Sequence, residues 1–430
     1  MSAGLETLGG HAEQLRLLRP YERSHPVTAP EHLLDELEAA GLTGRGGAGF
    51  PTHLKMRGVL AGQGPRIVVA NGAEGEPASN KDKTLLAVNP HLVLDGLQLA
   101  AQLVAADRAF LYVHDAPDLI AAAIRALAER ETSHADPCRV ELVTAPPAFV
   151  SGEESSVVSR ISGGPAVPRS KPPRVFECGA FGRPTLVQNV ETLAHVAYIA
   201  RAGAAEFRRL GPPAQPGTML FTVTGAVHDP GVVEAPVGTP LVELLELAGG
   251  LSAHPQAVLL GGYHGSWAPW ETARMLSMSN EALRPCGLSV GAGVVVVLPA
   301  DVCGPAEVAR VLDYLAASSA GQCGPCVFGL PALAASYRQV TGRRPGGRHR
   351  RRLAELPDLL ERRGGCHHPD GSLRFLRSAQ VTFAGHLATH RRGKCPLRDH
   401  PAVLPIPVTG RSAGSPRPAR CGSTAQGRAG

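Results

Sequence analysis

Glycine is concentrated in one short segment near the start of the chain, Gly44–Phe50, which reads Gly-Arg-Gly-Gly-Ala-Gly-Phe. Consecutive glycines let backbone N–H groups approach a phosphate or a flat ring closely. A dinucleotide fingerprint usually has a strand directly before such a loop, whereas the pattern here predicts a helix over residues 32–40. The segment therefore favours a cofactor cradle, with a flexible turn as the alternative.

Two acidic loops follow predicted strands. Asn71–Pro77 contains Glu74 and Glu76 and comes directly after a buried apolar strand at residues 66–71, and Ser151–Glu154 follows a strand at residues 139–144. Ligands of parallel sheets bind at the carboxyl ends of the strands. The acids could hydrogen-bond a ribose, a ring N–H or a carboxamide, so we expect both loops to face one cleft. A solvated acidic loop is the alternative.

Cysteines near the end of the chain have metal-ligand spacing. The pair Cys323 and Cys326 forms a CxxC motif, which can hold a metal or act as a redox pair. A thioredoxin site is disfavoured, because Gln322 replaces the usual Trp and the surroundings are predicted to be helical. Cys366 is the expected third thiol and Cys395 a candidate fourth.

The other five of the nine cysteines stand singly and are expected to be ordinary small residues. They are Cys138, Cys178, Cys286, Cys303 and Cys421. Clustered thiols are typical of metal or redox sites in a reducing compartment. We therefore expect no disulfide framework.

Composition narrows the class of protein. Of 430 residues, 43% are hydrophobic and 19% charged, so the chain can bury a large core. No apolar run reaches the ~18–20 residues of a membrane span, and the N-terminus lacks a secretory signal. The net charge is +6, but the arginines of residues 343–352 lie among glycines in a predicted loop, without interleaved aromatics. The predictions are a cytoplasmic protein, no nucleic-acid partner and no direct membrane insertion.

The elements that position these residues indicate an α/β fold with further modules. Short apolar strands alternate with helical patterns up to about residue 214, which predicts a parallel sheet. A small α+β module is expected at residues 215–300 and a helical bundle at 301–400, with helices at 305–317, 330–340, 353–363 and 376–390. Residues 1–30 are read as an extension and 401–430 as a disordered tail.

Together these segments resemble the NADH-binding flavoprotein subunit of bacterial respiratory complex I and the diaphorase subunits of NAD-linked hydrogenases and formate dehydrogenases. The resemblance runs in order over roughly residues 30–400. The matching stretches are Gly41–Thr52 with Lys55, Asn71–Pro77, Lys81-Asp82, Pro90–Val93, Gly152–Glu154, Lys171–Pro173, Gly182–Thr185, Asn189–Thr192 and Gly321–Cys326.

The resemblance implies a Rossmann-like FMN-binding domain (31–214), a β-grasp module of the SLBB type (215–300) and a helical iron–sulfur domain (301–400). It implies that NADH gives a hydride to FMN, which passes single electrons to a 4Fe–4S cluster. Glu76 and Glu154 are the expected catalytic residues, and Cys323, Cys326 and Cys366 the expected cluster ligands. The expected cofactor contacts are Gly44, Arg45, Gly46, Gly47, Ala48, Gly49, Phe50, Lys55, Asn71, Glu74, Gly152, Glu153, Glu154, Lys171, Gln188, Asn189 and Thr192.

The chain departs from the family within these sites. The first cysteine of the family's cluster loop is Ala320 here. A cubane requires four thiolates, so three outcomes stay open: a three-iron cluster, a substitute ligand (Cys395, His367 or His368), or no cluster. Family aromatic, acidic and hydroxyl side chains are also replaced, at Met56, Gly58, Ala73, Phe149 and Arg174.

The resulting expectation is an FMN-dependent NAD(P)H oxidoreductase with an iron–sulfur acceptor protein, either a 2Fe–2S thioredoxin-like subunit or a ferredoxin. A peripheral complex at the inner face of the membrane is one expected setting. The guanidinium of Arg174 could grip a phosphate, which leaves NADPH open as donor. The alternative is a paralogue that binds flavin but serves as a scaffold, because the changes at Ala320, Ala73 and Phe149 affect the sites.

Overall fold

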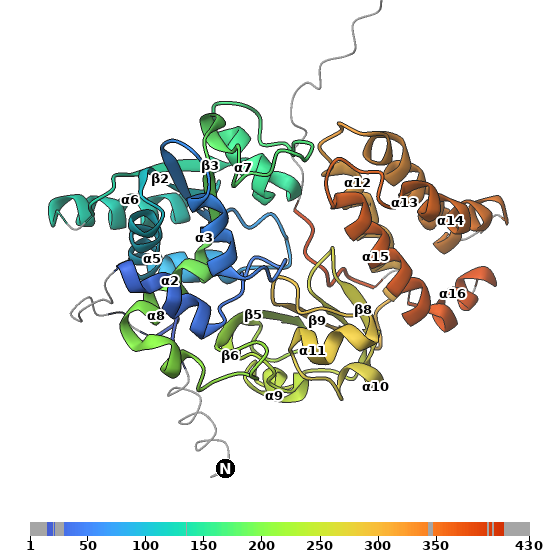
Figure 1. The fold of residues 1–430 in the computed structure, drawn as a ribbon. Helices are drawn as coiled ribbons and strands as arrows, with labels where there is room; N and C mark the ends of the chain where they lie inside the picture. The colour runs from blue at the N-terminus through green and yellow to red at the C-terminus, as the bar shows by residue number, and fades with distance from the viewer. Residues whose placement is uncertain are drawn as a thin grey trace, which may run out of the picture.

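The computed structural model describes residues 15–19, 21, 30–134, 136–342, 347–393, 395–397 and 400–407. These form an α/β region, a second region on a mixed sheet, and a C-terminal group of helices (Figure 1). The expected arrangement of a parallel α/β domain, a small α+β module and a helical bundle is thereby confirmed.

The α/β region is built on a parallel sheet in the order β3-β2-β1-β4. Its strands are β1 (Arg66–Gly72), β2 (Ala106–His114), β3 (Val140–Ala145) and β4 (Thr185–Asn189). Its helices are α2 (Pro30–Ala40), α3 (Thr52–Leu60), α4 (Lys81–Val88), α5 (Pro90–Leu103), α6 (Pro117–Thr132), α7 (Glu154–Ile161) and α8 (Val190–Phe207), with 3-10 turns at Phe149–Gly152 and Ala180–Gly182.

Both faces of this sheet are covered, which explains its continuous apolar strands. Along β1, Val68 and Ala70 pack in the core that contains α5 and α8. Their neighbours Ile67 and Val69 point to the opposite face, into the core that contains α7. Helices thus cover both faces of the sheet, and the loops that follow β1 and β3 lie at its carboxyl edge.

The second region has a five-stranded sheet in the order β6-β5-β9-β7-β8. The strands are β5 (Thr218–Gly225), β6 (Gly231–Pro236), β7 (Pro255–Leu260), β8 (Ser266–Pro269) and β9 (Val294–Pro299), and the short helices are α9 (Leu241–Glu246), α10 (Trp270–Ala273) and α11 (Asn280–Leu283), followed by a 3-10 turn at Arg284–Cys286. Along β9, Val295 and Val297 pack in the core of this region, while Val294 and Val296 pack in the core of the helical region. One face of this sheet therefore packs in the core of the second region, and the other face packs against the helical region.

The helical region consists of α12 (Gly304–Ala317), a π-helical turn (Pro325–Gly329), α13 (Leu330–Thr341), α14 (Gly347–Leu360), α15 (His368–Thr382) and α16 (Ala384–Arg391). The single helix predicted at residues 376–390 is wrong, because Phe383 interrupts it. The Phe383 ring is buried against Gly304 and lies 5.2 Å from the Trp267 ring, so the core turns the chain between α15 and α16. The arginine segment predicted as a loop is helical from Gly347 onward.

The described parts of both chain ends are packed. Leu17 is fully buried, and its backbone N–H donates to Glu234 at 2.8 Å. Leu404 is buried, and its N–H donates to Glu307 at 2.7 Å, so this part of the expected tail packs on the helical region. The rest of that tail, with Cys421, lies outside the described residues. No helix in the described ranges is both long and apolar enough to cross a membrane.

Candidate functional site

The glycine segment forms a closed loop between α2 and α3. Gly44 N–H donates to the carbonyl of Phe50 at 2.9 Å, and Thr52 N–H donates to that of Leu42 at 2.9 Å. Gly47 and Gly49 have φ values of 105° and 64°, which side chains rarely adopt. The glycines are thus required by the backbone path of the loop.

Arg45 and Thr192, both expected to contact the cofactor, hold this loop in place. The Thr192 hydroxyl accepts a hydrogen bond from Arg45 N–H at 2.9 Å. The buried Arg45 guanidinium donates to Pro216 O at 2.9 Å and to Thr43 Oγ1 at 3.1 Å. Arg45 therefore ties the loop to the chain entering the second region.

A cavity of about 270 Å³ lies where the loops of all three regions meet. Asn71 Nδ2 donates to Gly152 O at 3.0 Å, which ties the two acidic loops together as the sequence predicts. The second region contributes His264 and Ala292, and the helical region contributes Cys366–His368. Besides Cys366, the expected site residues that line this cavity are Gly46, Glu74, Glu76, Gly152, Glu153 and Asn189.

Glu76 spans the junction between the first two regions. Its carboxylate accepts hydrogen bonds from Tyr263 N–H at 2.7 Å and from Ala78 N–H at 3.1 Å. Desolvation by the surrounding protein raises the pKa of Glu76 to about 7, although those two N–H donors oppose the shift. The carboxyl group can therefore hold or release a proton near neutral pH.

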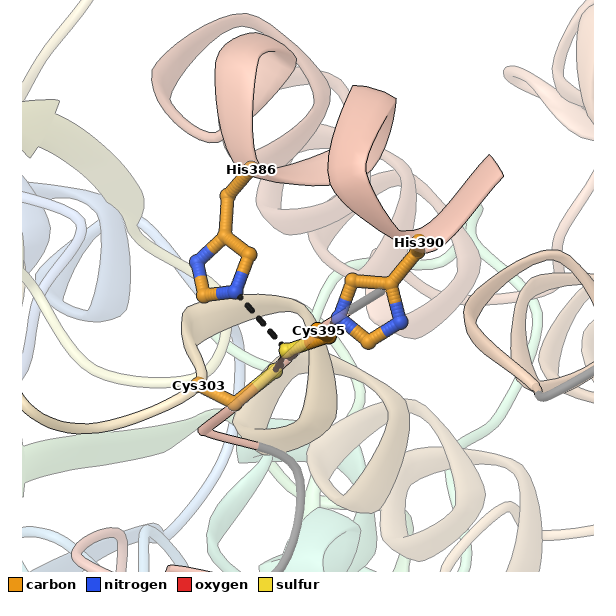
Figure 2. A group of neighbouring side chains, drawn as sticks. All are labelled: Cys303, His386, His390 and Cys395. Carbon is orange, nitrogen blue, oxygen red and sulfur yellow. Dashed lines mark hydrogen bonds between the residues drawn. The ribbon is translucent and has the colours of Figure 1, made fainter. Parts of the chain in front are cut away.

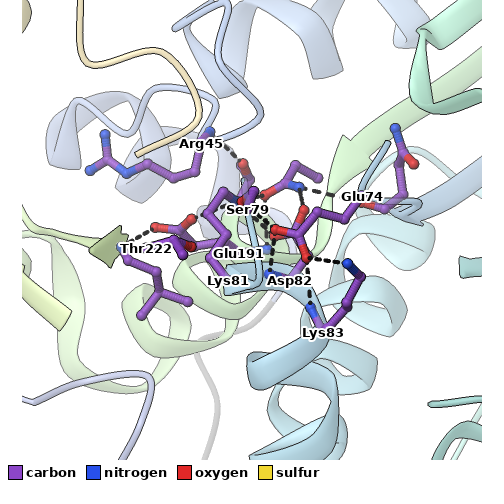
Figure 3. A network of polar contacts seen from close by, with 12 residues as sticks. Arg45, Glu74, Ser79, Lys81, Asp82, Lys83, Glu191 and Thr222 are labelled. Atoms are coloured by element: carbon purple, nitrogen blue, oxygen red, sulfur yellow. Dashed lines mark hydrogen bonds and ion pairs between the residues drawn. The ribbon is translucent and has the colours of Figure 1, made fainter. Parts of the chain in front are cut away.

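Buried charges stabilise the floor of the cavity (Figure 3). Lys81 Nζ contacts Asp82 Oδ1 at 2.7 Å and Glu191 Oε2 at 2.8 Å, and all three side chains are buried. Burial alone would lower the pKa of Lys81, but the two carboxylates outweigh burial and raise it. Lys81 thus stays protonated and balances the acids around it.

The same ion network connects the regions. Glu191 Oε1 accepts a hydrogen bond from Leu220 N–H of β5 at 2.8 Å. Asn189 caps the N-terminus of α8 by accepting from Glu191 N–H, and its Nδ2 donates to Asp82 at 2.7 Å. The N-terminus of α8, with its partial positive charge, is therefore fixed at the edge of the cavity.

Other expected cofactor contacts lie outside the lining of this cavity. Lys55 Nζ donates to Val187 O at 2.7 Å and contacts Glu154 at 3.3 Å, so the second expected catalytic acid is paired with this lysine. Lys171 contacts Glu153 at 3.2 Å on the surface. The Phe50 side chain is 51% exposed beside the glycine loop.

A second cavity, of about 360 Å³, contains the expected metal ligands. Cys323, Cys326 and Cys366 line it, together with Ala320, the position at which the resemblance predicts the first cysteine of the cluster loop. Both Cys326 and Val327 donate backbone N–H groups to the Cys323 carbonyl, at 3.0 and 2.9 Å, so the π-helical turn begins at the CxxC motif. Such turns are frequent at functional sites.

The electrostatic surroundings of the cysteines differ. Burial would raise the pKa of Cys323, but N–H groups of Gly365 and Cys326 that point at its sulfur outweigh burial and lower it. Burial raises the pKa of Cys326 to about 12 and also raises that of Cys366. Hydrogen bonds to sulfur are one of the means by which proteins tune iron–sulfur clusters.

Cys366 and His368 line both cavities. His368 uses both ring nitrogens, one toward Leu315 O at 2.8 Å and the other toward His264 Nε2 at 3.1 Å. The Phe149 ring lies 4.5 Å from the His264 ring, centroid to centroid. A wall about one side chain thick therefore separates the two cavities.

Of the three proposed substitute ligands, His368 lines the cysteine cavity, but its nitrogens are engaged as described. Cys395 and His367 are absent from the described lining. Cys395 instead lies beside Cys303, with 3.7 Å between the sulfur atoms. The expectation that Cys303 stands singly is wrong, because the bend at Phe383 brings α16 to the N-terminus of α12.

Comparisons with known proteins agree with this geometry. Family models match at residues 37–198 (Nuo51 FMN-binding domain), 220–262 (SLBB domain) and 306–390 (NADH-ubiquinone oxidoreductase-F iron-sulfur binding region). The F 2 subunit of the NADH-quinone oxidoreductase of Rhizobium meliloti (strain 1021) is 31% identical over 386 residues, which cover 86% of this chain and 91% of that protein. The chain belongs to the family of NADH-quinone oxidoreductase F subunits.

Another relative and a solved structure are also similar to this chain. The corresponding NADH-quinone oxidoreductase F subunit of Streptomyces coelicolor is 30% identical over 386 residues, covering 86% of this chain and 85% of that protein. Among solved structures, an NAD+-reducing NiFe-hydrogenase in the H2-reduced state matches with a TM-score of 0.79 at 30% identity, covering 90% of this chain and 67% of that chain. The resemblance inferred from the motifs is therefore confirmed.

The residues of this family member fit a flavin mononucleotide. A Cβ atom at Gly75 would lie 2.4 Å from Phe149 O, and one at Gly152 would lie 2.5 Å from Ala73 O, so the cavity rim admits no larger residues. Among the described residues, the buried Gln188 Nε2 finds no acceptor. Gln188 is next to Asn189, which lines the cavity, so its amide is a hydrogen-bond donor still open to a ligand.

Three residues of the site have no role that the sequence assigns. Lys81 and Asp82 belong to the family pattern, but only the structure shows that Lys81 is the central cation of the cavity floor. The sequence assigns His264 to the second module but predicts no role for it. The density of glycines around it, at Gly261, Gly262 and Gly265, is the signal that marks a close approach.

Proposed function

We propose that the chain is the NADH-oxidising flavoprotein subunit of an electron-transfer complex. The first cavity would hold FMN, which would supply hydride acceptance from NADH, and Cys323, Cys326 and Cys366 in the second would hold an iron–sulfur cluster that would supply one-electron transfer. The observation that supports this proposal is that Cys366 and His368 line both cavities, so the two candidate cofactor cavities are neighbours. When bound, the flavin supplies the exchange between two-electron and one-electron chemistry.

The chain's own residues bind and orient the cofactor. The glycine loop allows close backbone approach, and the N-terminus of α8 offers partial positive charge to the phosphate. Lys81, paired with Asp82 and Glu191, offsets the negative charge of the buried carboxylates at the floor of the cavity. Glu76 can hold or release a proton close to neutral pH at the junction of the first two regions, beside the cavity.

The three cysteines would hold the cluster. Their thiolates and the 360 Å³ cavity fit an iron–sulfur group, and Ala320 leaves one position without a protein thiolate. His368 is a poor replacement for the missing thiolate, because both of its ring nitrogens already have partners. We propose a cluster with three cysteine ligands and one open position filled from solvent.

The acceptor is an iron–sulfur protein that docks beside the CxxC motif. Val327 and Phe328, directly after Cys326, are 42% and 76% exposed. Exposed apolar side chains next to an electron-exit site are typical of a partner surface. A 2Fe–2S thioredoxin-like subunit or a ferredoxin would fit this role, in the cytoplasm or in a peripheral complex at the inner face of the membrane.

Phe50 and Arg174 are the exposed groups available to the nucleotide. Phe50 offers a ring face beside the glycine loop, and Arg174 offers a guanidinium that can grip a phosphate. We propose Arg174 as the residue that decides between NADH and NADPH. Steady-state kinetics of Arg174→Phe with both nucleotides would test this, and an unchanged NADPH/NADH preference would refute it.

The main function is tested by anaerobic purification followed by NADH titration of the visible spectrum. The proposal expects a flavin band that bleaches with about one NADH per flavin. A flavin band that responds to neither NADH nor NADPH would favour the scaffold, for which the substitutions at Ala320 and Ala73 argue. A colourless chain that cannot be reconstituted with FMN would refute both.

A further inference from the structure

A second group of metal-ligand side chains lies in the helical region, apart from the cysteine cavity. It consists of Cys303, His386, His390 and Cys395, whose ligand atoms all lie within 4.8 Å of one another (Figure 2). Cys303 is the residue directly before α12, while His386 and His390 lie one turn apart on the same face of α16. Two thiols and two imidazoles from three separate segments thus meet at one point.

The spacing of these atoms suits a single tetrahedral ion. A Zn²⁺ ion with sulfur ligands at about 2.3 Å would separate two sulfurs by about 3.8 Å, and the sulfurs of Cys303 and Cys395 are 3.7 Å apart. Cys303 Sγ lies 3.1 Å from His390 Nε2, and Cys395 Sγ lies 3.2 Å from His386 Nε2. The expected nitrogen–sulfur separation is about 3.5 Å, so a few tenths of an ångström of expansion admit the ion.

The orientation of His390 supports ligation through Nε2. Its Nδ1 lies 2.8 Å from the carbonyl oxygen of Thr341, which can only accept. Nδ1 therefore carries the proton, and the lone pair of Nε2 points at the sulfur atoms. A histidine that donates its other N–H to a backbone carbonyl is the usual arrangement around a protein-bound metal.

Other occupants of this group fit less well. A Rieske-type 2Fe–2S centre also takes two cysteines and two histidines, but its two irons and bridging sulfides would push the pairs apart. A Cys303–Cys395 disulfide would need the sulfurs at about 2.05 Å and would leave the half-buried His386 and the buried His390 pointing at the sulfurs with no ligand to bind. Four ligands of the S₂N₂ type with no open position are typical of a structural zinc site.

We propose that Cys303, His386, His390 and Cys395 bind one structural Zn²⁺ ion. The ion fastens α16 and the segment after it to the N-terminus of α12. That segment continues to residues 403 and 404, whose N–H groups donate to Glu307 of α12. The metal and this carboxylate together hold the last described stretch of chain against the core that also contains Cys326.

Metal analysis of the full-length, anaerobically purified protein tests the proposal. The expectation is about one zinc per chain, in addition to cluster iron. In the double variant His386→Ala/Cys395→Ser, zinc falls at least about tenfold while flavin and iron stay bound. The matched control Cys286→Ser removes an exposed cysteine outside the group and keeps its zinc.

A second measurement covers the case in which the double variant does not fold. Wild-type protein is stripped with a chelator and titrated with Co²⁺, and the difference spectrum is read for bands of a tetrahedral thiolate site, which Zn²⁺ then abolishes. Wild-type protein that contains no zinc and shows no such bands would overturn the proposal. A thiol titration of denatured, unreduced protein that finds two thiols too few would also overturn it, because it would indicate a disulfide. Bands that persist in a folded double variant would overturn it as well.

Discussion

The two cofactor cavities are built in opposite ways. The flavin cavity draws on loops of three regions and is lined by backbone, glycines and a balanced set of buried charges. The cysteine cavity depends on three sulfur atoms, with Ala320 where a fourth would stand. The two cavities have a common wall in Cys366 and His368.

This contrast explains why a single substitution should affect cofactor binding differently in the two cavities. A flavin is held by many weak contacts, so the change to Ala73 removes one hydrogen-bonding group among several. A cluster is held by few strong bonds, so each thiolate is a large share of its binding. Single changes in each cavity therefore separate the two cofactors.

The largest effect is expected from Cys366→Ser. Loss of one of three thiolates should reduce bound iron at least about tenfold, while FMN content stays close to wild type. Iron analysis beside flavin fluorescence measures both. The control Cys178→Ser changes an exposed cysteine outside both cavities and should alter neither. Equal loss of flavin and iron would contradict the separation.

Next in size is Lys81→Met in the flavin cavity. It leaves Asp82 and Glu191 buried without their cation, which costs about 3–5 kcal/mol of unfolding free energy. Denaturant unfolding measures the loss, and FMN content should fall with it. Lys83→Met is the control. It removes a lysine whose side chain is 31% exposed and whose Nζ lies 4.0 Å from Glu74, so stability should change by only about 0.5 kcal/mol.

Glu76→Gln is expected to have a smaller and pH-dependent effect. The folded-state pKa is raised to about 7 from 4.5, so the folded chain binds more protons than the unfolded chain between these values. Stability therefore falls as pH rises from 4.5 to 7, and the glutamine variant lacks that fall. We expect the variant to gain about 3 kcal/mol relative to wild type between roughly pH 4 and pH 8, the value that a pKa difference between 4.5 and about 7 implies.

Urea unfolding at both pH values checks this. The control is Glu271→Gln. Glu271 is exposed and pairs with Arg274 on the surface, so this change should leave the pH profile unaltered. Parallel profiles for Glu76→Gln and wild type would show that Glu76 does not hold a proton in the folded protein.

The smallest change in cofactor content is expected from Ala320→Cys, which supplies the missing thiol. A cluster with an open position loses its unprotected iron easily, so the variant should gain up to about a third more iron and survive air longer. Ala317→Cys adds a thiol on the same segment, but outside the cavity lining, and should gain nothing. An unchanged iron content in Ala320→Cys would mean that the open position is already protected.

Much of this architecture could be predicted from local pattern. The apolar runs at β1, β2 and β3 and the glycine loop have strong signals, and the CxxC motif marks its own cavity. The helix α8 has no such signal, because it is buried nearly all round and shows no polar face, as the fully buried Glu191 and His195 illustrate. Short strands such as β8 have too few residues for a period.

The site itself depended more on tertiary structure. Glu76 and Asn189 could be assigned from motifs, but the meeting of Cys366 with the flavin cavity arises from the packing of α15 against β8. Cys303 and Cys395 are 92 residues apart, and only the bend at Phe383 brings α16 over α12. Contacts at such separation leave no signature in a single sequence.

The central claim is that electrons pass from the flavin cavity to the cysteine cavity through their common wall. Electron paramagnetic resonance of anaerobic samples, frozen after NADH addition, tests it most directly. The account predicts a reduced iron–sulfur signal in wild type, and its loss in Cys366→Ser while NADH still bleaches the flavin. A flavin that bleaches in wild type with iron bound but no cluster signal would contradict it.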